Sequence, residues 1–280
     1  MNNQEITATT EPPNVGDLSE VREVMLSTQD LYCTLGGSSI LNGVNVAITS
    51  GETVGIIGPN GSGKTTLFNC ISGFCPATQG KILFRGKEIQ HEAPYRRAEH
   101  GIGRIFQNFG IFREMSVLEN VLTAIEGRAP MYKTFFPWGK VTRDNIAMAR
   151  EHLREVNLEV KASHKASSLS GGQMRLLEIV RTLAYGAELF LLDEPTAGVS
   201  PKMKEEVVGL IKKLHQMGKT VIVIEHDINF IQKFCGRIVV LDSGRVVLDD
   251  VPEKVRSNQL LQEIYFGKQD QQEAPRSTPL

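Results

Sequence analysis

The chain of 280 residues has little that marks a membrane-spanning, secreted or nucleic-acid-binding protein. Lys and Arg number 31 against 32 Asp and Glu, so the formal net charge is −1. This balance gives no overall attraction to nucleic acid or anionic lipid. No apolar run approaches the ~18–20 residues needed to cross a bilayer. The polar N-terminus, with Pro12 and Pro13, lacks the apolar core of a secretion signal. We therefore expect a cytoplasmic protein with no nucleic-acid partner.

Cysteine is also scarce. Its four positions show no C-x-x-C spacing and have no histidine cluster nearby. They are Cys33, Cys70, Cys75 and Cys235. Buried thiols in a reducing compartment are the favoured interpretation, ahead of a metal site or a disulfide framework.

A phosphate-binding loop is the first feature that the chain does have. Residues 58–65, GPNGSGKT, fit the pattern G-x-x-x-x-G-K-[ST]. They follow an apolar run at 54–57 that predicts a buried strand, and a helix is predicted over 64–73. Glycines allow a tight turn whose N–H groups cradle phosphates, and the helix N-terminus adds to this anion site. A glycine-rich turn that binds nothing is the alternative.

Two side chains of this loop have specific expected roles. Lys64 is expected to reach the β- and γ-phosphates of ATP, and the Thr65 hydroxyl to hold Mg²⁺. The predicted nucleotide-binding residues here are Gly58, Pro59, Asn60, Gly61, Ser62, Gly63, Lys64, Thr65 and Thr66.

A second motif, LSGGQ at residues 169–173, lies a little over a hundred residues after the phosphate loop. It also stands at the start of a predicted helix and so offers a second anion site. With both motifs in this order, the chain resembles the ATP-binding-cassette (ABC) ATPases. In that family the second motif closes over the ATP of a partner cassette. The resemblance therefore implies a homo- or heterodimer in which Ser170, Gly171, Gly172 and Gln173 contact the partner's nucleotide.

Two carboxylates follow the apolar run 189–192. Ligands of open α/β sheets bind at such strand ends. Asp193 is expected to hold Mg²⁺ through its hydration shell, and Glu194 to polarise the attacking water. Taken alone, a solvated Asp-Glu pair is an equally good interpretation. The resemblance adds Gln107, which implies contact with Mg²⁺ or the water, and His226, which implies contact with the γ-phosphate.

The pattern of apolar runs predicts an α/β fold. Strands over 23–26, 43–48 and 81–84 are expected to form an antiparallel sheet. Strands over 101–105, 189–192, 220–224 and 237–241 are expected further on, the last three alternating with helices as in a parallel sheet. Further predicted elements are a strand over 245–248 and helices that start at Ser116 and span 142–156, 170–184 and 202–217.

The resemblance organises these elements into an ABC cassette. It implies a mixed α/β nucleotide-binding core, an antiparallel β-subdomain and an inserted helical subdomain. The expected ATP-binding domain spans 23–267 with the helical subdomain at about 108–186. Residues 1–22 and 268–280 are expected to be disordered tails because of their polar composition.

Three stretches go beyond the motifs shared by all cassettes. They are residues 67–74, 106–121 and 175–179. They resemble the cassettes of bacterial branched-chain amino-acid uptake systems, with urea-uptake and lipopolysaccharide-export cassettes as close alternatives. The resemblance implies Mg-ATP hydrolysis at the cytoplasmic face of the inner membrane, with separate permease subunits and a periplasmic solute-binding protein. A non-transport ABC ATPase and a nucleotide-sensing scaffold are the alternatives from other classes.

Adenine recognition departs from the family pattern. The family places an aromatic residue upstream of the phosphate loop, where this chain has Leu35. Leu35 is therefore the expected adenine contact, by apolar packing alone. Tyr32, three residues away, is the alternative.

Overall fold

Two sheets and a set of helices make up the part of the chain that the computed structural model describes, residues 23–106, 110–128, 142–259 and 261. One sheet is antiparallel and has the strand order β2-β1-β4-β5. Its strands are β1 (Val24–Leu35), β2 (Ser38–Thr49), β4 (Gln79–Phe84) and β5 (Lys87–Glu88). The predicted antiparallel sheet is confirmed, although β1 and β2 are longer than predicted.

The second sheet has six strands in the order β10-β9-β3-β8-β7-β6. Its strands are β3 (Thr53–Ile57), β6 (Ile102–Ile105), β7 (Leu189–Asp193), β8 (Thr220–Ile224), β9 (Arg237–Asp242) and β10 (Arg245–Asp250). Only the edge pair β9 and β10 is antiparallel; the other pairs are parallel. Strands β3, β7 and β8 are buried along their whole length, as expected of parallel strands covered on both faces.

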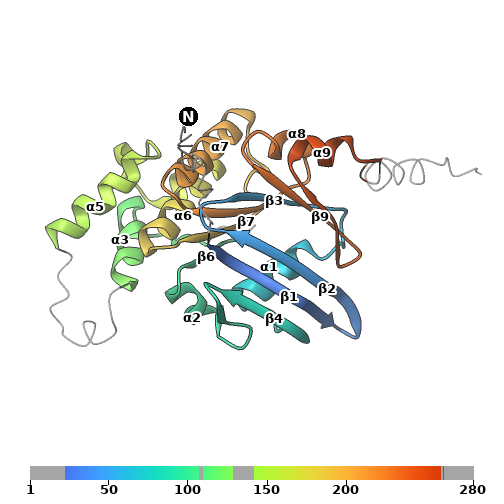
Figure 1. Ribbon diagram of the computed structural model, residues 1–280. Helices are drawn as coiled ribbons and strands as arrows, with labels where there is room; N and C mark the ends of the chain where they lie inside the picture. Colours follow the sequence, from blue (N-terminus) through green and yellow to red (C-terminus); the bar gives the residue numbers. More distant parts are fainter. Residues whose placement is uncertain (1–22, 107–109, 129–141, 260, 262–280) are drawn as a thin grey trace, which may run out of the picture.

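Helix α1 (Lys64–Ser72) lies between the two sheets (Figure 1). One hydrophobic cluster joins residues of the antiparallel sheet, of α1 and of the six-stranded sheet. Leu31, Phe68 and Ile224 are members, one from each of these parts. The helix that starts at the phosphate loop is therefore held on both sides by β-structure.

Among the described residues, three α-helices lie between β6 and β7 along the chain. They are α3 (Val117–Gly127), α5 (Arg143–Arg154) and α6 (Gly171–Tyr185), and they match the predicted helices to within two residues. The capping box predicted for Ser116 and Glu119 is present. These helices share a second hydrophobic cluster with α7 (Pro201–Gln216) and with the six-stranded sheet. The shorter helices are α2 (Pro94–Glu99), α8 (Ile228–Ile231), α9 (Pro252–Ser257), η1 (Glu159–Lys161) and η2 (Ala166–Ser168).

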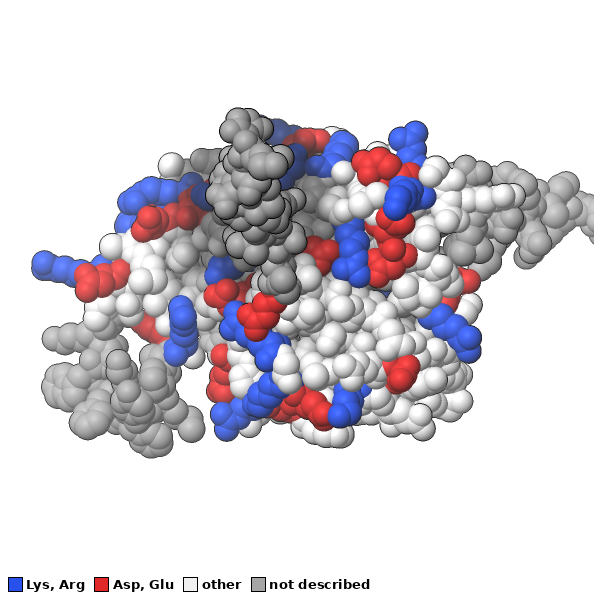
Figure 2. All heavy atoms as spheres, in the orientation of Figure 1, with Lys and Arg blue, Asp and Glu red and all other residues white. Residues whose placement is uncertain are grey.

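The distribution of surface charge agrees with the near-zero net charge of the sequence, and the helices agree with its lack of long apolar runs. Acidic and basic side chains are interspersed over the face in Figure 2, with no area of a single sign where described residues are visible. Within the described ranges, no helix has the length and apolarity to cross a membrane.

The four cysteines are free and buried, which confirms the expectation of buried thiols. Burial raises the pKa of Cys33 to about 11, and it also raises the pKa values of Cys70 and Cys235. These groups are therefore neutral thiols at physiological pH. Of the four cysteines, Cys33, Cys70 and Cys75 form a cluster that the sequence spacing does not reveal.

Candidate nucleotide-binding site

The phosphate loop connects the end of β3 to the start of α1, and two of its glycines have a steric reason. A Cβ added at Gly58 would lie 2.0 Å from the carbonyl oxygen of Leu241, so the loop passes directly over β9. Gly63 has φ 102° and occupies the N-cap position of α1. A side chain is strained in that left-handed conformation. The turn thus requires glycine at both ends.

Lys64 folds back over this loop. Its Nζ donates hydrogen bonds to the carbonyl oxygens of Gly58, at 2.7 Å, and Pro59, at 2.9 Å. Burial lowers the pKa of Lys64, while Glu194 and Asp193 oppose that shift. Two neutral carbonyls are weaker partners for an ammonium group than a phosphate is. The Ser62 hydroxyl is buried and has no hydrogen-bond partner among the described residues. Both side chains thus fit an arriving anion.

A cavity of about 280 Å³ joins the loop to the two predicted catalytic side chains that the structure describes. Its lining residues are Ile40, Asn60, Gly61, Gly63, Lys64, Thr65, Thr66, Glu194 and His226. His226 Nε2 lies 2.6 Å from Glu194 Oε1. Glu194 has φ 47°, an uncommon conformation for a residue other than glycine that is often found at functional sites. The structure therefore brings Lys64, Glu194 and His226 together.

Asp193 ends β7 and is held by a residue that sequence reasoning missed. Arg104, on the neighbouring strand β6, donates to Asp193 Oδ2 through Nη2 at 2.7 Å, and both side chains are buried. The guanidinium of Arg104 also lies over the Phe68 ring, 4.6 Å from its centroid. Burial lowers the pKa of Arg104 to about 10, so it is still charged at neutral pH. Burial raises the pKa of Asp193, and Arg104 opposes this shift.

Glu225 is a second residue that sequence reasoning missed. It precedes His226 and accepts hydrogen bonds at Oε1 from the Thr196 hydroxyl, at 2.7 Å, and the Thr196 N–H, at 3.3 Å. Burial raises the pKa of Glu225. This contact ties the turn after Glu194 to the turn that carries His226. The signal in the sequence was a charged residue directly after the apolar strand β8.

The LSGGQ motif starts α6, as predicted. Ser170 is the N-cap residue, and its hydroxyl accepts from the Gln173 N–H while the Gln173 side chain accepts from the Ser170 N–H. A Cβ added at Gly172 would lie 1.7 Å from Cγ of Met203, so α6 and α7 are in close contact here. Residues 170–173 do not line the cavity at the phosphate loop.

The remaining predicted site residues lie elsewhere. Leu35 ends β1 and is 45% exposed, and Tyr32 is 38% exposed. A Cβ added at Gly43 would lie 3.0 Å from the Tyr32 hydroxyl oxygen, so Tyr32 packs on β2. Neither residue lines the cavity, whereas Ile40, which sequence reasoning did not single out, does. Gln107 lies outside the described residues.

Comparison with known proteins decides the family. Residues 41–197, more than half of the chain, match the family described as ABC transporter. The chain belongs to the ABC transporter family. Its predicted fold class, an ABC cassette with a mixed α/β core, an antiparallel sheet and inserted helices, is confirmed by solved cassettes.

Relatives within this ABC family are similar over nearly their full length. The high-affinity branched-chain amino acid transport ATP-binding protein BraF of Pseudomonas aeruginosa is 37% identical, over 87% of this chain and 98% of that protein. The probable branched-chain amino acid transport ATP-binding protein LivG of Archaeoglobus fulgidus is 35% identical, over 88% and 96%.

Solved structures agree with this assignment. A crystal structure of the ADP conformation of an ATP-binding cassette of an ABC transporter matches with a TM-score of 0.77 and 32% identity, covering 87% of this chain and 99% of that one. A dimeric cassette in a post-hydrolysis state, bound to ADP and Pi, matches with a TM-score of 0.69 and 31% identity, covering 81% and 99%. The chain is therefore a nucleotide-binding cassette of an ABC transporter.

Proposed function

We propose that this chain is the ATP-hydrolysing subunit of an ABC transporter that takes up branched-chain amino acids. The observation that carries the proposal is that one cavity is lined by the phosphate loop, Glu194 and His226. The names of the relatives support the solute, because cassettes similar over their full length serve branched-chain amino acid transport. Uptake would pass through separate permease subunits, supplied by a periplasmic solute-binding protein, with the chain peripheral on the cytoplasmic face of the membrane.

ATP binding starts with a change of partners at Lys64. The phosphates of ATP occupy the space over the loop, where N–H groups and the N-terminus of α1 favour negative charge. Lys64 Nζ then leaves the carbonyl oxygens of Gly58 and Pro59 for the β- and γ-phosphates. The Ser62 hydroxyl gains a partner in the same step.

Hydrolysis depends on Glu194. Its carboxylate accepts a hydrogen bond from the attacking water and takes up the proton as the water oxygen bonds to the γ-phosphorus and the bond to the bridging oxygen breaks, releasing ADP. Without nucleotide, His226 Nε2 contacts this carboxylate at 2.6 Å; with ATP bound, the same nitrogen would donate a hydrogen bond to the phosphoryl oxygens instead. The Glu194 N–H donates a hydrogen bond to the Ile224 carbonyl oxygen at 3.0 Å, which ties the backbone of the base to the end of β8.

The oxygen donors fit Mg²⁺, which prefers oxygen ligands and keeps part of its water shell. Thr65 lines the cavity, and Asp193 lies at the end of β7, held by Arg104. Thr65 and Asp193, with Gln107, would hold the ion. When bound, Mg²⁺ supplies charge neutralisation at the phosphates.

A second cassette completes the proposed site. Ser170 and Gly172 start α6, which has its own helix N-terminus, yet they do not line the cavity of their own chain. We propose that they close on the γ-phosphate held by the partner cassette. The dimeric form of a similar cassette supports this arrangement.

The proposal is tested with the Lys64→Ala variant. Removing the ammonium group should weaken ATP binding by at least ~10-fold, a loss of about 1.4 kcal/mol, and abolish phosphate release. Cells that lack their own copy of the cassette, supplied with the wild-type chain, should recover uptake of labelled leucine, and cells supplied with Lys64→Ala should not. Unchanged ATP affinity in the variant would refute the site. Recovery of urea uptake in place of leucine uptake would refute the solute.

A further inference from the structure

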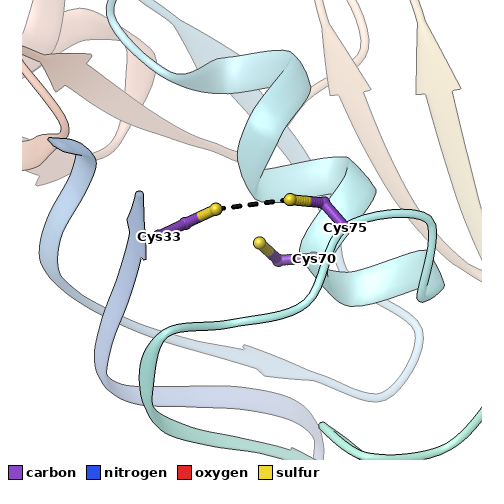
Figure 3. Close-up of side chains that lie close together, drawn as sticks. All are labelled: Cys33, Cys70 and Cys75. Carbon is purple, nitrogen blue, oxygen red and sulfur yellow. Dashed lines mark hydrogen bonds between the residues drawn. The ribbon is translucent and has the colours of Figure 1, made fainter. Parts of the chain in front are cut away.

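Three cysteines from separate parts of the chain place their sulfur atoms together (Figure 3). Cys33 lies on β1, Cys70 on α1, and Cys75 in the turn after α1. The three Sγ atoms lie within 4.8 Å of one another, and those of Cys33 and Cys75 are 3.3 Å apart. Within the described residues, no other group of three His, Cys, Asp or Glu is close enough to share one ion. The geometry is that of three donors around one point.

The surroundings of this cluster select the kind of ion. All three side chains are buried within the hydrophobic cluster between the two sheets. Among the described residues, the one oxygen with a hydrogen bond to these sulfurs is the Pro76 carbonyl, 3.6 Å from Cys33 Sγ and 3.7 Å from Cys75 Sγ. Sulfur donors favour soft ions. A buried complex that carries net charge would be costly, so a neutral one is favoured.

We propose that Cys33, Cys70 and Cys75 form a three-sulfur site for a trivalent thiophilic ion of the arsenic(III) class. Three thiolates neutralise an ion of charge +3, and three sulfur bonds complete the coordination of trivalent arsenic. Zn²⁺ on the same ligands would leave a net charge of −1 and would lack the fourth ligand of a tetrahedral structural site. The cluster therefore discriminates by both charge and ligand number.

Binding balances without any redox step. Arsenous acid, As(OH)₃, loses three hydroxyl groups, and each cysteine loses its thiol proton. Three As–O bonds and three S–H bonds break, three As–S bonds form, and three water molecules leave. The oxidation state of arsenic is unchanged, so no oxidant or reductant is needed.

The bound ion would tie β1 to α1 and to the turn that follows α1. Cys70 belongs to the helix that begins at the phosphate loop, and Cys33 lies two residues before Leu35 at the end of β1. Because the site exists only in the folded chain, the ion should raise the melting temperature. At a hundredfold excess over Kd the expected rise is about 5–10 °C.

The experiment uses the full-length, reduced chain and arsenite as the probe. Native mass spectrometry should show one arsenic atom replacing three protons, and X-ray absorption should show three sulfur neighbours. The variants Cys33→Ala, Cys70→Ala and Cys75→Ala should each bind arsenite at least ~10-fold more weakly. Cys235→Ala is the matched control, since Cys235 is buried in a different cluster and should not change binding. Zn²⁺ at the same concentration should give no rise in melting temperature.

Several results would overturn the site. These are no arsenic bound to the wild-type chain, arsenic with fewer than three sulfur neighbours, and binding that survives Cys75→Ala. A zinc-induced rise equal to that with arsenite would refute the argument from charge. The absorption measurement needs only the wild-type chain, so it decides the matter even if a variant does not fold. None of these outcomes depends on ATP hydrolysis, so failure here is distinct from failure of the proposed function.

Discussion

At the scale of single residues, the site depends on side chains that hold other side chains. Arg104 fixes Asp193 from the neighbouring strand, and Glu225 fixes the backbone and hydroxyl of Thr196. Both are charged groups with little solvent around them, so each costs free energy that its hydrogen bonds must offset. Their role is to position Asp193 and the turn after Glu194 beside the phosphate loop.

The Glu225→Gln variant separates the charge of Glu225 from its hydrogen bonds. A glutamine oxygen can still accept from both Thr196 donors, but it carries no buried charge. We expect Glu225→Gln to unfold at pH 7 at the same temperature as the wild type or higher. Glu225→Ala is the matched control and should lose about 1–3 kcal/mol of stability, because the Thr196 donors are left buried without an acceptor.

The effect of Glu225→Gln should depend on pH in a defined direction. Burial raises the folded-state pKa of Glu225 above its ordinary value of 4.5. The wild type is therefore relatively stabilised below pH 4.5, where Glu225 is protonated in both states, and loses this stability as the pH rises through the folded-state pKa. Glutamine does not titrate. Thermal unfolding of both proteins from pH 4 to 7 should show a difference that grows with pH; a constant difference would contradict the assignment.

Sequence reasoning found the residues whose motifs are local. The phosphate loop, the Asp193-Glu194 pair and the LSGGQ motif each occupy a few consecutive positions, and their strand or helix context is as expected. Arg104 was missed because its partner is 89 residues away, and only the pairing of β6 with β7 brings them together. The cysteine cluster was missed for the same reason, since Cys33 and Cys75 are 42 residues apart.

At the scale of secondary-structure elements, an irregularity in strand pairing explains why the first predicted strand was too short. β1 was predicted to end at Leu26 but continues to Leu35. Its pairing with β2 shifts register between Thr28 and Leu31, and Asp30 there has φ 42°. Such a bulge breaks the alternation of apolar and polar residues from which strands are predicted. Beyond the bulge, Leu31 and Cys33 are buried and alternate with exposed residues, and the strand continues in its pairing with β2.

The contact between α6 and α7 gives a prediction at Gly172. Alanine has a higher helix propensity than glycine, yet the Cβ of an alanine at position 172 would lie 1.7 Å from Cγ of Met203 on α7. We expect Gly172→Ala to destabilise the fold by about 1–3 kcal/mol, as overpacking does. Adding Met203→Ala should recover part of the loss in a double-mutant cycle by chemical denaturation.

Gly209 supplies the control for this experiment. It lies within α7, and an added Cβ there would meet nothing within 4 Å. Gly209→Ala should therefore stabilise the protein by about 0.5–1 kcal/mol. If Gly172→Ala were equally stabilising, the close approach of the two helices would be wrong.

Leu35, at the end of β1, gives a prediction about how tightly the chain binds the adenine of ATP. Leu35 offers apolar contact but no aromatic face, and stacking on a base is worth ~1–3 kcal/mol in nucleic-acid sites. We expect Leu35→Tyr to tighten ATP binding several-fold and to improve its selectivity over GTP, measured by calorimetry. Tyr32→Ala should have little effect, because Tyr32 packs against β2 at Gly43. A tenfold loss in Tyr32→Ala, about 1.4 kcal/mol, would make Tyr32 the base-stacking residue instead.

At the scale of the whole molecule, the arrangement of the two predicted anion sites is consistent with the proposed second cassette. The phosphate loop and Glu194 share a cavity, whereas the LSGGQ motif starts a helix whose first residues lie outside it. In the proposed function, bound ATP would present its γ-phosphate to Glu194 of its own chain, while the Ser170 end of α6 would contact the nucleotide of another. If so, nucleotide binding and dimerisation would be coupled in a single equilibrium.

Glu194→Gln should stop this equilibrium in its closed state. Glutamine cannot accept the proton of the attacking water, so phosphate release should fall by ~10²–10⁴-fold while ATP binding is retained. With Mg-ATP the variant should elute as a stable dimer, alone or with a partner cassette, and it should return to monomer with ADP. Adding Ser170→Glu should prevent the dimer, because a carboxylate would face the partner's γ-phosphate. Ser257→Glu, on the distant exposed surface of α9, is the matched control and should leave the dimer intact. If Glu194→Gln remained a monomer with Mg-ATP and every co-expressed cassette, the LSGGQ motif would not act on a second chain's nucleotide.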